Sequence, residues 1–339
     1  MINQDPQYYI QGVLAQDRRI VSKTITLIES SLPSHQELAR NILDALLPHT
    51  GKSVRLGITG VPGVGKSTFI ESFGMMLVRD KTHPLKKGTK IPKAYNVAVL
   101  AVDPSSTRSG GSILADKTRM ENLSTHERAF IRPSPSGGTL GGVARKTRET
   151  MLICEAAGFD VIIVETVGVG QSETTVASMV DFFLVLMLAG AGDELQGIKK
   201  GVLEIADAIA INKADGDNIE KAKRAKKEYE TALHLLRPSS SHWTPPVMTC
   251  SAMEVAGIDN IWRTISDHRE KLSEAGELEE KRRSQSLDWM WSMVEDGLKE
   301  RFYKNEKVKK SLTRLTLEVE KGITAPTLAA NELLHLMDI

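Results

Sequence analysis

The stretch "GVPGVGKSTF", residues 60–69, fits the phosphate-binding P-loop pattern of glycines, a lysine and a serine. The apolar run "SVRLGIT" before it predicts a strand, and "STFIESFGMMLVR" after Lys66 has the apolar spacing of a helix. Lys66 is expected to reach the β- and γ-phosphates, and the Ser67 hydroxyl to bind Mg²⁺. A chance glycine-rich turn is the alternative, but the spacing and both flanks favour the P-loop. The residues expected to contact nucleotide here are Gly60, Gly63, Val64, Gly65, Lys66, Ser67 and Thr68.

Apolar runs alternate with helical stretches from about residue 54 to residue 250. The runs after the first are "NVAVLAVD", "FDVIIVET", "FFLVLML", "ADAIAINK" and "PVMTC". Because they are almost wholly apolar, they predict parallel strands that are covered on both faces. The alternation predicts an α/β fold with a doubly wound, mostly parallel sheet.

The two ends of the chain have a different character from this central part. Residues 1–50 predict a helical extension that is broken near Pro33 and stopped by Pro48 and Gly51. Residues 51–262 are assigned to the nucleotide domain. Residues 263–339 are charged and helical, and their apolar positions need another surface, on the same chain or on a second copy.

The composition excludes several classes of protein. The 339 residues include 44 basic and 43 acidic side chains, so general affinity for nucleic acid is not expected. No apolar run approaches the roughly 20 residues of a membrane span. The N-terminal stretch resembles neither a signal nor a transit peptide, so a cytoplasmic location is expected. Cys154 and Cys250 lie far apart in apolar surroundings, which favours core residues over a disulfide.

The stretch "INKADG", residues 211–216, indicates which base is bound. It follows an apolar run, so it is expected at the carboxyl end of a strand, where open α/β sheets bind ligands. Asn212, Lys213 and Asp215 match the guanine-recognition pattern, in which the carboxylate accepts hydrogen bonds from guanine N1–H and N2–H₂. A simple turn is the alternative, since Asn, Asp and Gly favour turns. A P-loop alone does not distinguish ATP from GTP, but its combination with this pattern favours GTP over a simple turn. Ser251 and Ala252 are expected to support guanine O6.

Acidic residues follow two of the predicted strands and are candidates for the Mg²⁺ and hydrolysis site. Asp103 and Glu165 each end an apolar run, where a carboxylate is costly unless it faces a metal ion or a polar site. Asp116 is a third candidate, or else an ordinary loop residue. Gly168 is placed to offer its N–H to the γ-phosphate, and Gln171 either orients water or serves as a structural residue of a switch.

Two further segments contain charged residues and glycine. Residues 189–201, "AGAGDELQGIKKG", follow a predicted strand and form either a switch that senses phosphate loss or an exposed loop. Residues 80–95 contain five lysines and two prolines. They predict an exposed insertion, with a basic docking surface as the alternative.

These motifs, read together, resemble the MeaB/ArgK/MMAA family of P-loop GTPases. The resemblance covers about residues 20–300 and rests on "GVPGVGKSTFIE", "VAVLAVDPSS", "GGSILADKTRM", "IRPSPSGGTLGG", "VIIVETVGVGQSE", "AGAGDELQGIKKG" and "INKADGDN". The family acts as chaperones of adenosylcobalamin-dependent methylmalonyl-CoA mutase or related acyl-CoA mutases. The 80–95 insertion and the tail beyond about residue 300 depart from the family pattern.

The resemblance also implies cofactors, partners and residue roles. It implies Mg²⁺ with GTP and GDP, no cobalamin bound by this chain itself, and a homodimer with helical arms. From the composition, neither nucleic acid nor a membrane is expected as a partner. The implied metal set is Ser67, Asp103, Asp116 and Glu165, and the implied catalytic set is Lys66, Asp103, Asp116, Glu165 and Lys199. Lys199 belongs to the segment that would couple nucleotide to the mutase.

Three other functions are alternatives to this one. A nickel-type metallochaperone GTPase would need a Cys or His cluster, whereas the eight histidines are scattered. A protein kinase linked to amino-acid transport would need an acceptor pocket, which no motif marks. A binding module with an inactive nucleotide site is disfavoured by the intact set of candidate residues.

Overall fold

The computed structural model describes residues 3–79, 93–102, 120–133, 140–166, 168, 172–190, 200–234 and 240–337. The chain divides into two compact units, Met1–Leu278 and Glu279–Ile339. No helix in these described ranges is long and apolar enough to cross a membrane. The division of the sequence at residues 50 and 262 stays a prediction.

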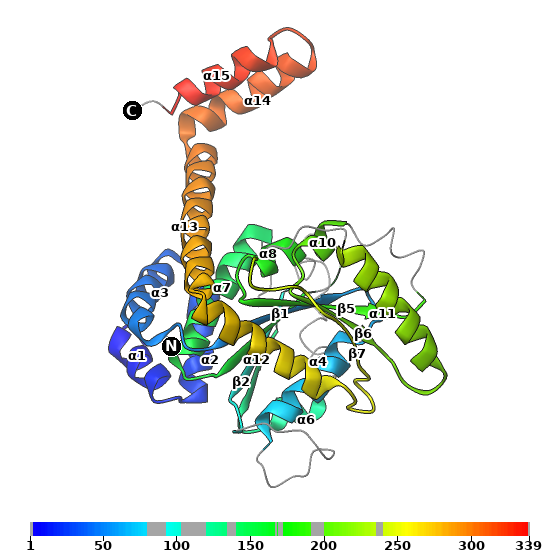
Figure 1. Cartoon of the computed structure of the whole chain (residues 1–339). Helices are drawn as coiled ribbons and strands as arrows, with labels where there is room; N and C mark the ends of the chain where they lie inside the picture. The colour runs from blue at the N-terminus through cyan, green and yellow to red at the C-terminus, as the bar shows by residue number, and fades with distance from the viewer. Residues whose placement is uncertain are drawn as a thin grey trace. The chain divides into compact units, whose positions relative to one another are not determined.

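The first unit is built on a parallel sheet (Figure 1). Within the described residues the sheet has seven strands in the order β3-β2-β4-β1-β5-β6-β7, and every neighbouring pair is parallel. The strands are β1 (Val54–Gly60), β2 (Val97–Val102), β3 (Ala129–Arg132), β4 (Val161–Thr166), β5 (Phe182–Leu188), β6 (Ala208–Asn212) and β7 (Val247–Thr249). The predicted fold class is confirmed, and β3 is a strand that the sequence analysis missed.

Helices cover both faces of the sheet, which makes it doubly wound. One face carries α4 (Lys66–Val78), α6 (Glu121–Thr125) and α12 (Ile258–Glu274). The other carries α7 (Leu140–Ala156), α8 (Glu173–Ala177), α10 (Lys200–Glu204) and α11 (Ile219–His234). Successive residues of β4 alternate between the two cores, with Ile163 in one and Ile162 and Val164 in the other. Strand side chains alternate in this way because a strand repeats every two residues.

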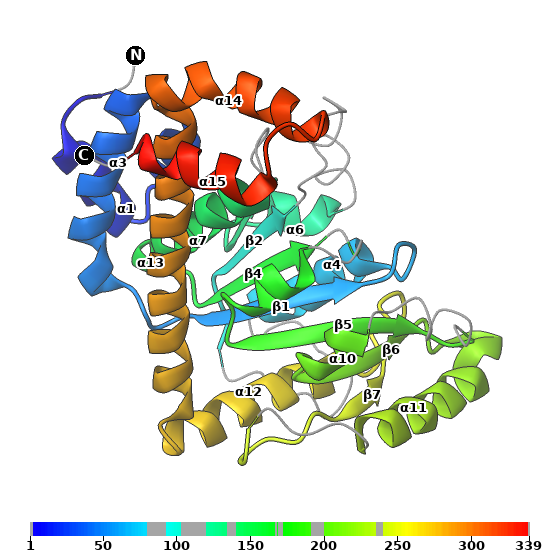
Figure 2. The same ribbon diagram turned by 90° about the horizontal axis from the view of Figure 1, so that it is seen from above.

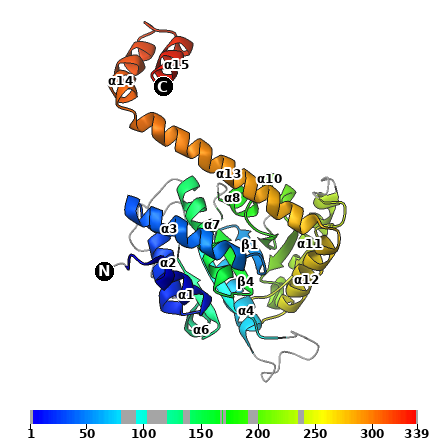
Figure 3. The ribbon, with the colours of Figure 1, turned by 90° about the vertical axis from the view of Figure 1, so that its left-hand side faces the viewer.

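Three N-terminal helices extend the second of these layers. They are α1 (Pro6–Leu14), α2 (Arg18–Glu29) and α3 (Pro33–Leu46), and all three contact α7, as Figure 3 shows. Asp17 caps α2 by accepting hydrogen bonds from the N–H groups of Arg19 and Ile20. The predicted break near Pro33 is confirmed, and a short 3₁₀ helix (Leu47–His49) follows α3.

The second unit consists of helices joined by short connections in its described part. It contains most of α13 (Glu277–Lys304), together with α14 (Glu306–Glu320) and α15 (Pro326–His335). The last two helices pack on each other and bury Val308, Leu315 and Ala329. In contrast, α13 leaves a row of large apolar side chains exposed at helical spacing, namely Leu287, Met290, Trp291, Val294 and Leu298.

Candidate nucleotide site

The loop from Gly60 to Lys66 joins the carboxyl end of β1 to the first turn of α4. Figure 2 shows β4, β1, β5 and β6 side by side in this part of the sheet. Gly65 precedes α4 with a left-handed backbone, φ +91°, and a Cβ on it would lie 3.2 Å from the amide nitrogen of Asn212. Glycine adopts this backbone without steric cost. The strand–loop–helix arrangement that a P-loop requires is therefore present.

Lys66 lies across this loop. Its Nζ donates hydrogen bonds to the carbonyl oxygens of Gly60, at 2.7 Å, and Val61, at 3.4 Å. Burial lowers the pKa of Lys66, and the nearby carboxylates of Glu165 and Glu173 offset part of this shift. The ammonium is thus a partly desolvated charge at the mouth of the loop, and such charges interact strongly with anions.

Ser67 and Glu165 are brought together from α4 and β4. The Ser67 hydroxyl donates a hydrogen bond of 3.4 Å to Oε1 of Glu165, whose side chain is buried. Next to them, Thr166 donates a hydrogen bond of 2.7 Å to Thr59 and joins the ends of β4 and β1. Mg²⁺ prefers oxygen ligands and is usually held by one or two protein groups plus phosphates and water. The hydroxyl and the carboxylate fit that donor set.

Gly168 follows β4 and lies against the P-loop. Its φ is +86°, and a Cβ on it would lie 2.0 Å from the carbonyl oxygen of Gly60 and 2.9 Å from Nζ of Lys66. Only glycine can occupy this position without displacing the P-loop backbone. The loop after β4 therefore approaches the place where a γ-phosphate is expected.

Asn212, at the end of β6, joins three loops. Its Nδ2 donates a hydrogen bond of 2.9 Å to the carbonyl oxygen of Val64, and its Oδ1 accepts one of 3.2 Å from the N–H of Ala252. The Cys250 thiol donates to the same Oδ1 at 3.6 Å. Burial raises the pKa of Cys250 to about 12, so the thiol keeps its proton. The buried Asn212 side chain consequently links the P-loop to both segments of the expected guanine site, residues 211–216 and 250–252.

Lys213, Asp215 and Ser251 complete this part of the site. Lys213 has a left-handed backbone, φ +58°, and its Nζ donates a hydrogen bond of 2.8 Å to the carbonyl oxygen of Gly63. The Ser251 hydroxyl donates to Oδ2 of Asp215 and also accepts from the N–H of Glu254. These contacts leave Oδ1 of Asp215 as an acceptor of the kind that a guanine N–H pair requires.

A comparison with protein families identifies the chain. Residues 21–307 match the family described as "Methylmalonyl Co-A mutase-associated GTPase MeaB". The chain belongs to the MeaB family. It is a P-loop GTPase, in agreement with the site described above.

Individual relatives of this MeaB-family GTPase cover most of its length. GTPase ArgK of Escherichia coli is 49% identical over 317 residues, which is 94% of this chain and 92% of that protein. The mouse mitochondrial methylmalonic aciduria type A homolog is 42% identical over 333 residues, which is 95% of this chain and 77% of that protein. A crystal structure titled LAO/AO transport system kinase is 41% identical, covers all of both chains and superposes with a TM-score of 0.78.

Several of the candidate residues named from the sequence lie outside the described residues. They are Asp103, Asp116, Gln171 and Lys199. Most of the 189–201 and 80–95 segments are also outside the described ranges. Of the site residues expected from the sequence, the structure places the P-loop, Glu165, Gly168, Asn212, Lys213, Asp215, Ser251 and Ala252 at the carboxyl edge of the sheet.

Two residues of this MeaB-family site were not singled out from the sequence. Glu173, in the first turn of α8, is buried, and its charge acts on Lys66 together with that of Glu165. Ser72, on α4, donates a hydrogen bond of 2.6 Å to the carbonyl oxygen of Ala252. The sequence contained a signal for Glu173, because it is an acidic residue at the start of the helix that follows Gly168. It contained no signal for Ser72.

Proposed function

We propose that this GTPase is a chaperone of an adenosylcobalamin-dependent acyl-CoA mutase, with methylmalonyl-CoA mutase as the first candidate. It would gate the loading of intact cofactor and protect or reactivate the mutase. The observation that carries this proposal is the match of residues 21–307 to a family described as mutase-associated. A mouse relative whose name refers to methylmalonic aciduria supports it.

In this proposal the two halves of GTP are bound by different loops. Asp215 would accept the guanine N–H groups, Lys213 would lie along the base, and Ser251 and Ala252 would support O6. The P-loop N–H groups, Lys66 and Gly168 would hold the phosphates. Asn212 contacts both groups of residues, which supports a shared site.

Hydrolysis in this proposal depends on oxygen ligands next to the P-loop. Ser67 and Glu165 would hold Mg²⁺, with Asp103 and Asp116 as further acids. The metal ion would neutralise charge that develops on the transferred phosphoryl group. Lys66 would stabilise the same charge.

The coupling to a mutase would use the 189–201 segment and a dimer. GTP and GDP forms must contact the mutase differently, because a nucleotide that binds both states equally shifts no equilibrium. Lys199 would take part in stimulated hydrolysis. The exposed apolar row on α13 supports a homodimer, since such a row is stabilised by a second copy. A cytoplasmic location is part of the same proposal.

The test is GTP hydrolysis by the purified chain with and without methylmalonyl-CoA mutase. The expected result is faster phosphate release with the mutase, which Lys199→Ala abolishes and the neighbouring Lys200→Ala retains. No stimulation and no complex with any cobalamin-dependent acyl-CoA mutase would refute the chaperone role. Transfer of the γ-phosphate to a protein, without release of free phosphate, would instead support the kinase alternative.

A further inference from the structure

A cavity of about 400 Å³ lies at the edge of the sheet opposite to the nucleotide site. It is lined by residues at or before the amino ends of β1, β2 and β4 and by the side of α12. A second cavity, of about 480 Å³, shares Lys52 and Asp160 with it. Each falls in the range of about 300–1,000 Å³ that is usual for small-molecule sites. None of the residues expected to bind GTP lines either cavity.

The floor of the first cavity is apolar. Val54, Trp262 and Ile265 are buried there, and Tyr95 packs edge-to-face on Trp262 with ring centroids 5.1 Å apart. Phe73 supports Trp262 from the core side, at 6.0 Å. Aromatic side chains fixed on both sides form a rigid surface for an apolar ligand body.

The acidic group beside this floor is already neutralised. Asp160 accepts a hydrogen bond of 2.7 Å from Nζ of Lys93 and one of 2.8 Å from the N–H of Asn96. The same Lys93 ammonium lies 5.2 Å from the centre of the Tyr95 ring. Lys93 and Asp160 therefore cancel each other's charge and close one side of the cavity.

Two other cations of the rim, Arg269 and Lys52, are not paired with a carboxylate of the described residues. Arg269 donates a hydrogen bond of 2.8 Å only to the carbonyl oxygen of Lys52, and Nζ of Lys52 has no hydrogen bond or ion pair within the described part of the chain. The remaining charge of the rim is the exposed carboxylate of Glu270, which also has no partner there. The rim thus has an excess of positive charge above an apolar floor.

We infer that this cavity binds an organic anion, with its carboxylate, sulfonate or phosphate on Lys52 and Arg269 and its flat apolar body on the floor of Tyr95 and Trp262. The backbone oxygen of Lys52 holds the guanidinium of Arg269 in place, so this cation is positioned before a ligand arrives. The site is independent of the proposed mutase chaperone role.

The probe for this site is 8-anilinonaphthalene-1-sulfonate, a monoanion with a flat apolar body whose fluorescence rises in apolar surroundings. Titration of the GDP-saturated protein should give one saturable site, because GDP occupies the opposite edge of the sheet. The double variant Lys52→Gln/Arg269→Gln should weaken binding about tenfold or more, as expected for the loss of charge-assisted hydrogen bonds. Lys52→Gln alone, at an exposed position, should give part of that loss with the fold intact.

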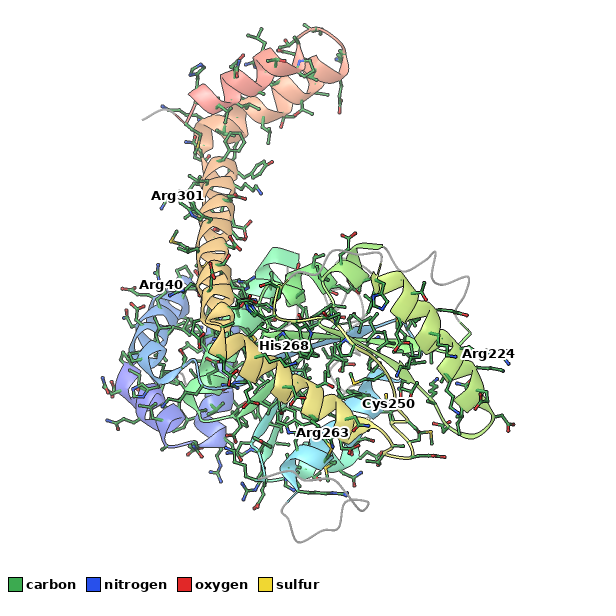
Figure 4. The ribbon with its side chains drawn as sticks, in the orientation of Figure 1. Arg40, Arg224, Cys250, Arg263, His268 and Arg301 are labelled. Atoms are coloured by element: carbon green, nitrogen blue, oxygen red, sulfur yellow. The ribbon has the colours of Figure 1, made fainter. Side chains whose placement is uncertain are left out.

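Two further variants make the charge argument specific. Glu270→Gln removes the one opposing charge and should tighten binding. The matched control Arg224→Gln/Lys227→Gln removes the same two charge types from exposed positions on α11, where Figure 4 labels Arg224, and should leave binding unchanged. All variants should retain GTP hydrolysis, which reports folding. Absence of a saturable site, equal loss in the control, weaker binding in Glu270→Gln, or displacement by GDP would each overturn the assignment.

Discussion

The carbonyl oxygen of Gly60 lies 2.0 Å from the point that a Cβ atom on Gly168 would occupy. The loop after β4 thus reaches the P-loop backbone itself, at the place where Lys66 is also held. Position 168 therefore requires glycine for two reasons: there is no space for a Cβ atom, and the backbone is left-handed.

Gly168→Ala is therefore expected to lower the rate of GTP hydrolysis by at least about tenfold, since the methyl group must push the two loops apart. The matched control is Gly276→Ala, because Gly276, just after α12, also has a left-handed backbone, φ +73°, but no atom of the described residues within 4 Å of its Cβ position. Steady-state phosphate release measures both variants. Equal activity of the two would contradict the steric argument.

Asp215→Asn is expected to reduce the preference for GTP over other purine nucleotides. An amide cannot accept both guanine N–H groups as a carboxylate does, and such polar mismatches change selectivity by up to about 10⁴-fold. Competition binding with GDP, ADP and xanthosine diphosphate measures this. Asp217→Asn, two residues further along in an exposed position, is the control and should keep wild-type selectivity. Full retention of selectivity by Asp215→Asn would refute the guanine assignment.

Glu165→Gln is expected to lower the hydrolysis rate by about 10²-fold or more while GDP affinity changes little. Glu165 and Glu173 both act on the charge of Lys66, and Glu165 also accepts a hydrogen bond from the Ser67 hydroxyl. Glu173→Gln is therefore the comparison, with a smaller expected loss. If both variants lost activity equally, the effect would run through Lys66 and not through a metal ligand.

Glu149 predicts a pH dependence of stability. It is buried in α7, and burial raises its pKa above 4.5 despite a hydrogen bond of 2.9 Å from Arg145. The folded chain then binds more protons than the unfolded chain in this range. Glu149 stabilises the fold fully at a pH below the pKa that it has in the unfolded chain. This stabilisation is lost as the pH rises through the pKa that Glu149 has in the folded chain.

Glu149→Gln should accordingly gain stability relative to wild type as the pH rises above about 4.5, as measured by urea unfolding. Glu220→Gln is the control of opposite sign. A hydrogen bond from Lys223 lowers the pKa of Glu220, so that carboxylate stabilises the fold above its unfolded pKa. A relative gain by Glu149→Gln that shrank with rising pH would contradict the prediction.

Met290→Asp/Val294→Asp is expected to yield monomers if the apolar row on α13 forms the proposed dimer. Charges placed in such a row oppose burial on both copies. Light scattering after size-exclusion chromatography gives the mass. Ser292→Glu is the control, because Ser292 is exposed outside the apolar row. A wild-type chain that is monomeric at all concentrations would refute the dimer.

The sequence alone predicted those parts of the fold that follow from apolar periodicity or from a known motif. Six strands, α4 and the helix break at Pro33 followed from apolar spacing and proline chemistry. β3 was missed because its four residues, "AFIR", include a charged residue and are too short to show a period. Tertiary pairing with β2 makes it a strand.

The candidate site was predictable where function requires a particular residue at a fixed spacing, as at Lys66 or Asp215. The sequence could not show contacts between distant segments. Ser72 supports Ala252 from 180 residues away, and Thr166 reaches Thr59 across 107 residues. Such contacts depend on strand order, which spacing along the chain does not encode.

The pairing of β1 also has a consequence for synthesis of the protein. β1 is the first strand to leave the ribosome, yet its neighbours are β4, beginning with the pair Val54 and Val161, and β5, which ends at Leu188. Both hydrogen-bonding edges of β1 therefore stay open until β4 has been made, and one of them stays open until β5 has followed. Open edges of this kind pair readily with foreign strands. The nascent chain needs protection during this interval, until β4 and β5 close over β1.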